Sequence, residues 1–236
     1  MRRRRWTLIT ALVLVAMARQ GTAATAPQSV RPGAIVRWPG EGIVECRQGD
    51  QRSTPLEGVC YFPIDLLATG KLAVERRTAQ GVERRTLAIA SYPYPTESLT
   101  GVEEKYVSPP KAELARIERE QQETAAVFRR RTARSLVLPL GKPLAKLPEG
   151  GRFGSRRIFN GEARSPHGGT DFKAAAGTVV YAAADGVVAL AASQFFAGNA
   201  VYVDHGDGLV TMSFHLSAML VKTGAIVQRG QAIGKV

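Results

Sequence analysis

Two glycines separate His167 from Asp171, and this spacing limits how the chain can fold there. On a helix, residues four apart share one face. However, each glycine costs a helix about 1 kcal/mol relative to alanine, and Pro166 precedes the pair. In a straight strand, residues four apart lie about 13 Å apart, slightly too far to hold one ion at ligand distances of about 2 Å. The sequence therefore predicts a bent strand, with Gly168 and Gly169 at the bend.

Histidine and aspartate are preferred zinc ligands, so His167 and Asp171 are candidate metal ligands. The alternative is a surface histidine in a glycine-rich turn, because a lone His-x-x-x-Asp pattern is short and degenerate. The surrounding sequence favours the metal interpretation. The pair lies in an ordered series of glycine-rich and apolar stretches, at residues 164–172, 176–188, 198–211, 215–217 and 224–234.

This series resembles the lysostaphin/LytM-type zinc metallo-endopeptidases, metallopeptidase family twenty-three, which cut peptide bonds in bacterial peptidoglycan. The resemblance covers about residues 150–236 and implies a LytM-type antiparallel β catalytic module. It implies that His167 and Asp171 are the first two ligands of one Zn²⁺ per active site. It also implies that His215, in a His-Leu-Ser motif, is one of two catalytic histidines beside a metal-activated water.

The sequence departs from the family pattern at its end. The family takes its third zinc ligand and its other catalytic histidine from a later His-x-His motif, whereas this sequence stops at Val236. His205 lies in a turn where the family places no ligand. Because a catalytic zinc uses three protein ligands and a water, we expect residues 150–236 to be a C-terminally incomplete peptidase module.

Residues 1–26 are predicted to be a signal peptide. Arginines 2–5 precede an apolar run, residues 6–18, and Ala24-Thr25-Ala26 resembles a cleavage site. The run is too short for a membrane span of about 20 residues, and we expect no transmembrane span in the mature chain. The expected location is the periplasm or the cell exterior.

Residues 30–107 are predicted to form a small all-β module. Leu72 and Val74 alternate with polar neighbours, as do Leu87 and Ile89, while glycines 58, 70 and 81 recur at turn spacing. The only cysteines, Cys46 and Cys60, belong to this module. Export favours a structural disulfide between them; half of a metal site is the alternative.

Residues 108–149 are predicted to be a helix and a linker. Ser108-Pro109-Pro110 is a helix start signal, and the helix is expected over residues 111–131. Its expected apolar stripe consists of Leu114, Ile117, Ala125 and Phe128, and its expected charge pairs are Arg116/Glu120 and Arg119/Glu123. Arginines 129–131 and Arg134 suit the negative end of the helix dipole; contact with the wall or with phospholipid is the alternative.

Within residues 150–236, strands are predicted at 179–181, 186–190 and 201–203, followed by a hairpin turn at 204–208. The returning strand should place Leu209, Thr211, Ser213 and His215 on one face and Val210, Met212 and Phe214 on the other, core-facing side. This alternation predicts that His215 is not a buried core histidine. The fold class is therefore mainly β, with a connecting helix between two β modules.

The formal net charge is +12, and five of these charges belong to the predicted signal peptide. The remaining excess could favour anionic envelope polymers, although ordinary solubility also explains it. No aromatic and basic cluster indicates nucleic-acid binding. The resemblance predicts an exported zinc endopeptidase that hydrolyses peptide cross-links, with peptidoglycan as partner and an envelope protein regulator as a further candidate. The alternatives are a non-catalytic LytM-like module that binds and activates a separate cell-wall amidase, and a module that only binds the wall.

Overall fold

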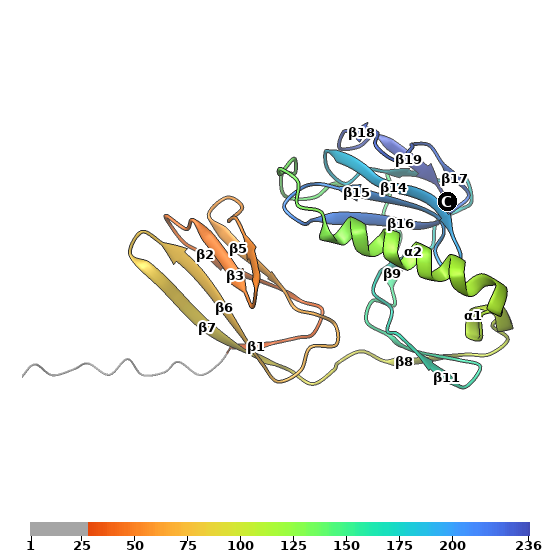
Figure 1. The fold of residues 1–236 in the computed structure, drawn as a ribbon, viewed down its shortest axis with the longest axis horizontal. Helices are drawn as coiled ribbons and strands as arrows, with labels where there is room; N and C mark the ends of the chain where they lie inside the picture. The colour runs from red at the N-terminus through yellow and green to blue at the C-terminus, as the bar shows by residue number, and fades with distance from the viewer. Residues whose placement is uncertain (1–27) are drawn as a thin grey trace, which may run out of the picture.

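The computed structural model describes residues 28–236 and is mainly β, as the sequence predicts (Figure 1). The signal peptide predicted for residues 1–26 lies outside the described residues. Two helices, α1 (Glu104–Val107) and α2 (Lys111–Arg129), separate an N-terminal group of strands from a C-terminal group. In residues 28–236, neither helix combines the length and apolarity that crossing a membrane requires.

The N-terminal module consists of two layers of strands. Its larger sheet has the order β1-β7-β6-β3-β4, and β2 pairs with β5 in the second layer. The strands are β1 (Gln28–Val30), β2 (Ile35–Pro39), β3 (Glu45–Gln48), β4 (Gln51–Ser53), β5 (Val59–Pro63), β6 (Lys71–Thr78) and β7 (Gly81–Ile89). The predicted alternation is confirmed, because Val74 and Leu87 are fully buried between the layers. Glycines 58, 70 and 81 all have positive φ, which explains their turn positions.

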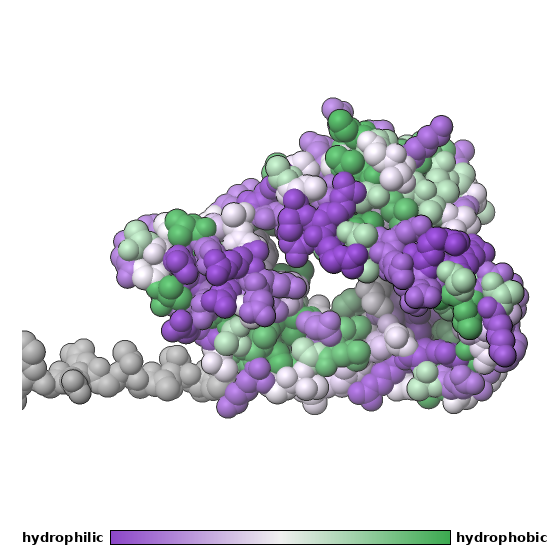
Figure 2. Space-filling model, viewed as in Figure 1, coloured by the Kyte–Doolittle hydropathy of each residue, from purple (hydrophilic) through white to green (hydrophobic). Residues whose placement is uncertain are grey.

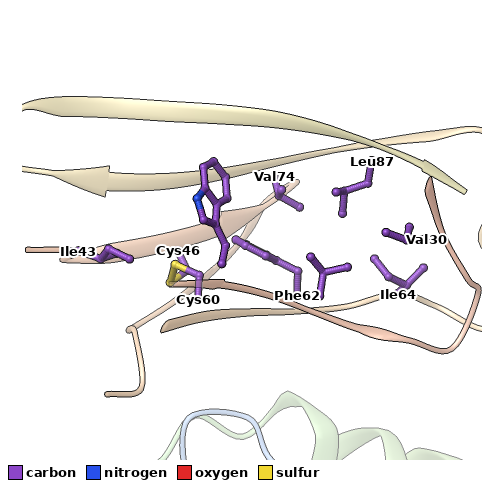
Figure 3. Packing of buried hydrophobic residues seen from close by; sticks show 10 residues of the cluster. Val30, Ile43, Cys46, Cys60, Phe62, Ile64, Val74 and Leu87 are labelled. Atoms are coloured by element: carbon purple, nitrogen blue, oxygen red, sulfur yellow. A yellow bond between two sulfur atoms is a disulfide. The ribbon is translucent and has the colours of Figure 1, made fainter. Parts of the chain in front are cut away.

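The core of this module is shown in Figure 3, where side chains from β1, β2, β3, β5, β6 and β7 fill the space between the two layers. The predicted disulfide is present: Cys46 on β3 is joined to Cys60 on β5, with a Cα–Cα distance of 5.6 Å. Both cysteines are buried. Trp38 and Phe62 pack nearby with ring centroids 6.4 Å apart. The disulfide therefore links the two layers through their shared core.

After β7 the chain crosses to the C-terminal half of the molecule. Strand β8 (Thr96–Leu99) pairs with β10 (Arg156–Phe159), which also pairs with β11 (Glu162–Arg164). The crossing is held by aromatic residues, since Tyr94 donates its hydroxyl to the Pro32 carbonyl at 2.9 Å and stacks edge-on against Phe153. Strand β8 lies within residues 30–107, but its sheet partners belong to the later part of the chain.

The C-terminal module is built on a sheet with the order β16-β15-β14-β18, from β14 (Gly186–Gln194), β15 (Gly198–Asp204), β16 (Val210–Leu216) and β18 (Ile226–Val227). A second sheet contains β13 (Val179–Tyr181), β19 (Ala232–Lys235) and β17 (Ala218–Met219). Buried Val188, Val201 and Ile233 belong to the core that the two sheets share. The predicted strands 179–181, 186–190 and 201–203 are confirmed.

Helix α2 covers the opposite face of the four-stranded sheet (Figure 1). The predicted start after Pro110 is confirmed, and the helix ends at Arg129, two residues earlier than expected. The predicted apolar stripe is wrong in part, because Leu114 and Phe128 are 50% and 46% exposed. Ile117, which the predicted stripe includes, is buried, and so is Val127. The polar residues Glu120 and Thr124 lie between them on the same face of the helix.

The basic segment after α2 joins the two modules. Arg134 donates to the carbonyls of Thr54 and Pro55, each at 3.0 Å, and forms an ion pair with Asp207 of the β15–β16 hairpin. Arg130 lies 3.7 Å from the buried Asp204 carboxylate. On the face seen in Figure 2, hydrophilic residues dominate where the two modules approach each other. Arg131 donates to the Phe128 carbonyl at 3.0 Å, as the helix-end interpretation predicts, whereas Arg130 and Arg134 link loops.

Candidate metal site

One segment of chain, residues 150–155, holds both candidate metal ligands in place. Strand β9 (Gly150–Gly151) pairs antiparallel with β12 (Asp171–Phe172), in the register Gly151 opposite Asp171. The same register continues to His167, whose N–H donates to the Ser155 carbonyl at 2.9 Å. A Cβ at Gly150 would lie 2.6–2.8 Å from the Thr170 and Phe172 side chains, so this close pairing requires glycine. Residues 150–155 therefore hold both His167 and Asp171, which pair with opposite ends of that segment.

The connection from His167 to Asp171 is irregular, with a bend at Gly169 and no helix. This confirms the predicted bent segment. The bend brings the His167 Nε2 atom to 3.2 Å from an Asp171 carboxylate oxygen. The His167 side chain is 12% exposed, whereas the Asp171 side chain is 55% exposed. The pair therefore lies at the surface, with its imidazole partly covered and its carboxylate open to solvent.

This geometry fits a metal ligand pair. A zinc ligand lies about 2.0–2.2 Å from the ion, so two ligand atoms of one tetrahedral site are about 3.4 Å apart. The observed separation of 3.2 Å is close to this value. A direct ion pair between the two residues would satisfy the same distance. Across residues 28–236, no group of three or more His, Cys, Asp or Glu side chains converges as a metal site. The described residues thus bring two donors together.

His215 lies at the end of β16 and is exposed. Its predicted face is wrong, because a β-bulge interrupts the alternation. Val201 pairs with Ser213 while Asn199 pairs with Leu216, and His215 has φ 55°. Leu216 therefore continues the face of Ser213, and the extra residue leaves His215 outside the regular pattern. The expectation that His215 is not a core histidine is confirmed. Within the described residues, no hydrogen bond or ion pair joins it to His167 or Asp171.

The assignment of Met212 and Phe214 to the core side is also wrong. Both are exposed, at 44% and 40%, and Phe214 stacks on Tyr202 at the edge of the face that α2 covers. The opposite face of β15, with Val201 and Val203, belongs to the core between the sheets. An edge strand can extend beyond the helix that covers the rest of the sheet, so its apolar side chains stay exposed. The alternation of residues along the strand does not reveal this.

His205 is fully buried and has a structural role. Its Nδ1 atom lies 2.7 Å from the Asp185 carbonyl and its Nε2 atom 2.8 Å from the Thr211 hydroxyl. Both ring nitrogens are therefore occupied by hydrogen-bond partners inside the protein, and neither is directed at His167 or Asp171. This agrees with the expectation that His205 is not a metal ligand.

Replacing His205 with alanine is expected to destabilise the protein by about 2 kcal/mol, because it opens a cavity and leaves the Thr211 hydroxyl unpaired. The urea midpoint of unfolding measures the effect. His215→Ala is a matched control in the same hairpin, and it should leave the midpoint unchanged because that ring is exposed. Equal midpoints for the two variants would contradict a structural role of His205.

Three residues near the pair were not identified from the sequence. Arg152 lies 4.0 Å from the Asp171 carboxylate and 3.8 Å from Glu97. The buried Ser155 donates its hydroxyl to the same Glu97 at 3.1 Å, while its carbonyl accepts the His167 N–H. These contacts join residues far apart in sequence, so the sequence gives little sign of them. The one signal is Gly150-Gly151, because two glycines before the motif indicate that another backbone segment approaches closely.

The C-terminal module thus combines two packed β-sheets with a His-x-x-x-Asp pair at the surface, on a bent segment of the chain. Residues 165–236 match the model of peptidase family M23, which identifies this part of the chain as an M23 domain. The match includes His167, Asp171 and His215, and it confirms the resemblance found in the sequence.

Similar proteins agree with this identification. The peptidoglycan DD-endopeptidases ShyA and ShyC of Vibrio cholerae are 46% identical over 83 residues and 43% identical over 84 residues, respectively. Each alignment covers 35% of this chain and 19% of the relative, so the chain spans about a fifth of the length of these proteins. A crystal structure described as a peptidase M23 from Pseudomonas aeruginosa is 29% identical, covers 90% of this chain and 84% of that one, and has a TM-score of 0.63.

Proposed function

We propose that this protein is an exported zinc endopeptidase that hydrolyses peptide cross-links of bacterial peptidoglycan. The observation that carries the proposal is the His167–Asp171 pair, 3.2 Å apart within the segment that matches family M23. The homologous ShyA and ShyC proteins are peptidoglycan DD-endopeptidases, which supports peptidoglycan as the substrate class. The periplasm or the cell exterior would be the place of action.

His167 and Asp171 would hold one zinc ion through the imidazole Nε2 atom and a carboxylate oxygen. Among residues 28–236, the buried Nδ1 atom of His167 has no hydrogen-bond partner. Because a zinc-bound histidine donates this N–H to a carboxylate, a carbonyl or a water, a water would serve as that partner in the metal-loaded site. A catalytic zinc uses three protein ligands. We propose that the third comes from a His-x-His motif C-terminal to Val236.

Zinc polarises a carbonyl oxygen and lowers the pKa of a water to about 7 when it is bound. The residues of this chain would supply the other steps. His215 would orient the attacking water, take up its proton, or stabilise the oxyanion, because an exposed imidazole can act as a general acid or base. Arg152 would keep the Asp171 carboxylate oriented, because it lies within 4.0 Å of the second carboxylate oxygen.

The remaining parts of the chain would serve this activity. Residues 1–26 would direct export, residues 30–107 would form an accessory β module, residues 108–149 would connect it, and residues 150–236 would belong to the peptidase module. The hydrogen bonds from Arg134 to the Thr54 and Pro55 carbonyls, together with its ion pair to Asp207, support a fixed relation between the accessory module and the peptidase module. An envelope protein could then regulate the enzyme through the accessory module.

The test uses the full-length gene product, loaded with zinc and incubated with purified bacterial peptidoglycan. We expect about one zinc per protein and the release of peptides whose cross-links are cut, identified by mass spectrometry. A protein that neither binds zinc nor cuts cross-links would contradict the proposal. If such a protein instead stimulated a purified cell-wall amidase, the non-catalytic alternative would replace it.

A further inference from the structure

Helix α2 contacts the turn between β14 and β15, residues 195–197, which lies beside His215. The Glu120 carboxylate accepts the Phe195 N–H at 2.7 Å, and its other oxygen pairs with Arg116 at 2.7 Å. The Glu120 side chain is only 13% exposed. A partly buried carboxylate that accepts two hydrogen bonds, one of them charge-assisted, fixes its partners firmly. The helix therefore holds this turn through a directed polar contact as well as by apolar packing.

A second polar contact joins the same two elements. Gln194, which is 7% exposed, donates its side-chain amide to the Thr124 hydroxyl at 3.2 Å and accepts from the Tyr202 hydroxyl at 2.8 Å. Buried polar groups that are all satisfied make a local structure rigid and specific. The last residue of β14, Gln194, and the first residue of the turn, Phe195, are thus both held by a helix that precedes the M23 domain in sequence.

The turn between β14 and β15 also holds His215. The carbonyl of Ala197 accepts the His215 N–H at 2.9 Å. A Cβ built on Gly198 would lie 3.6 Å from the His215 Nδ1 atom, so the ring lies close to the turn backbone. Because His215 is the extra residue of a β-bulge, regular strand pairing does not fix its orientation. Its contacts with residues 197 and 198 supply that orientation instead.

The turn also presents an aromatic ring to solvent. Phe196 is 48% exposed and stacks edge-on against Phe195, with centroids 4.9 Å apart. Phe195 itself packs against Tyr106, at 5.7 Å. Residues 195–197 carry no charge, and the exposed Phe214 immediately precedes His215. Two exposed phenylalanines therefore belong to the backbone segments that meet at His215. A rigid aromatic side chain of this kind contributes apolar contact area at low entropic cost.

We propose that Phe196 and Phe214 form a subsite that binds the neutral, apolar part of a peptide next to His215, and that Glu120 is a positioning residue for this subsite. The proposal rests on the proposed function, because it takes the peptide cross-link as the ligand. It gives the connecting helix α2 a role in substrate binding. A sugar ring of the glycan strand is the alternative occupant that the test excludes or identifies.

The first test measures binding to the full-length protein after zinc has been removed with a chelator, so that hydrolysis does not interfere. The probes are a cross-linked peptide dimer free of sugars and a glycan oligosaccharide free of peptides, each titrated by calorimetry. We expect the peptide dimer to bind and Phe196→Ala to weaken its binding about tenfold, which corresponds to about 1.4 kcal/mol. Phe128→Ala is the matched control, because it removes a phenylalanine of similar exposure, 46%, from the other end of α2.

The second test concerns Glu120. Glu120→Ala should weaken peptide binding about as much as Phe196→Ala, whereas Glu120→Gln should retain most of it, because the amide oxygen can still accept the Phe195 N–H. Hydrogen exchange at the Phe195 amide should accelerate in Glu120→Ala and stay slow in Glu120→Gln. Rescue by glutamine, together with an unchanged unfolding midpoint, would distinguish positioning from a general loss of stability.

Peptide binding by Phe196→Ala that equals wild type would overturn the subsite, as would a wild-type protein that binds only the oligosaccharide or neither probe. These results are separable from failure of the proposed function. If the zinc-loaded wild type cuts peptidoglycan while Phe196→Ala binds the peptide dimer normally, the peptidase remains and the subsite is wrong. If the protein binds the peptide through Phe196 but cuts nothing, the subsite remains and the catalytic proposal is wrong.

Discussion

Asp171→Ala and His215→Ala are expected to separate metal binding from turnover in the zinc-loaded full-length protein. Asp171 is one of two donors that the structure brings together, so its loss should lower zinc affinity by more than about 100-fold and abolish hydrolysis, since even residues that only support a ligand contribute 10–100-fold. Among the described residues, no hydrogen bond or ion pair joins His215 to the pair, so His215→Ala should keep nearly the same zinc content and lower kcat by about 10²–10⁴-fold.

Zinc content measured by mass spectrometry after dialysis, together with release of peptides from peptidoglycan, distinguishes these outcomes. Asp50→Ala is a suitable control, because Asp50 is an exposed carboxylate in the N-terminal module. If both site variants kept zinc and activity, the assigned roles would be wrong. If His215→Ala lost zinc together with Asp171→Ala, His215 would have to be reassigned as a ligand.

The bend between His167 and Asp171 could be predicted from the sequence because its cause is local. Two glycines and a preceding proline disfavour a helix, and two residues four apart must then approach each other through a bend. The element that fixes them could not be predicted in this way. Residues 150–155 pair with the His-x-x-x-Asp motif through backbone hydrogen bonds. Such bonds depend on the position of the backbone, so the order of the side chains hardly indicates them.

The orientation of His215 was missed for a related reason. Alternation assigns faces on the assumption that a strand is regular, and one inserted residue reverses every later assignment. Asn199 pairs with Leu216 while Val201 pairs with Ser213, so the reversal occurs just before the candidate catalytic residue. Gly198-Asn199 opposite the bulge is the only local signal, since Gly198 has a φ of 60°, which favours glycine.

Helix α2 illustrates how polar residues can form a buried face. The apolar pattern suggested Leu114 and Phe128, but the sheet that α2 covers ends in a turn whose polar groups need partners. Glu120 and Thr124 meet these groups through the Phe195 N–H and the Gln194 amide. Hydropathy cannot identify such positions, because a glutamate that accepts a buried N–H looks like any solvent-exposed glutamate in the sequence. The charge pair Arg116/Glu120 was predicted correctly, and its structural role exceeds that of an exposed helix pair.

Removing the Cys46–Cys60 disulfide is expected to destabilise the N-terminal module by about 3 kcal/mol, the value that the chain-entropy model assigns to a loop of this length. The sequence separation is 14 residues. The module is small and buries little apolar surface, so losing this contribution should clearly lower its urea midpoint of unfolding. The double variant Cys46→Ala/Cys60→Ala isolates the cross-link, since serine would also place two hydroxyls in a core where the cysteines are 1% and 0% exposed.

The urea midpoint, followed through the fluorescence of Trp38 in the same core, measures this loss. Reduction of the wild-type protein should lower its midpoint to about that of the double variant, whereas the reductant should leave the variant unchanged. The C-terminal module shares no cysteine with this core, so hydrogen exchange in β14 and β15 should stay as slow as in wild type. Loss of protection in both modules together would instead mean that the Arg134 contacts make them one cooperative unit, and the stabilising effect of the disulfide would then extend to the candidate metal site.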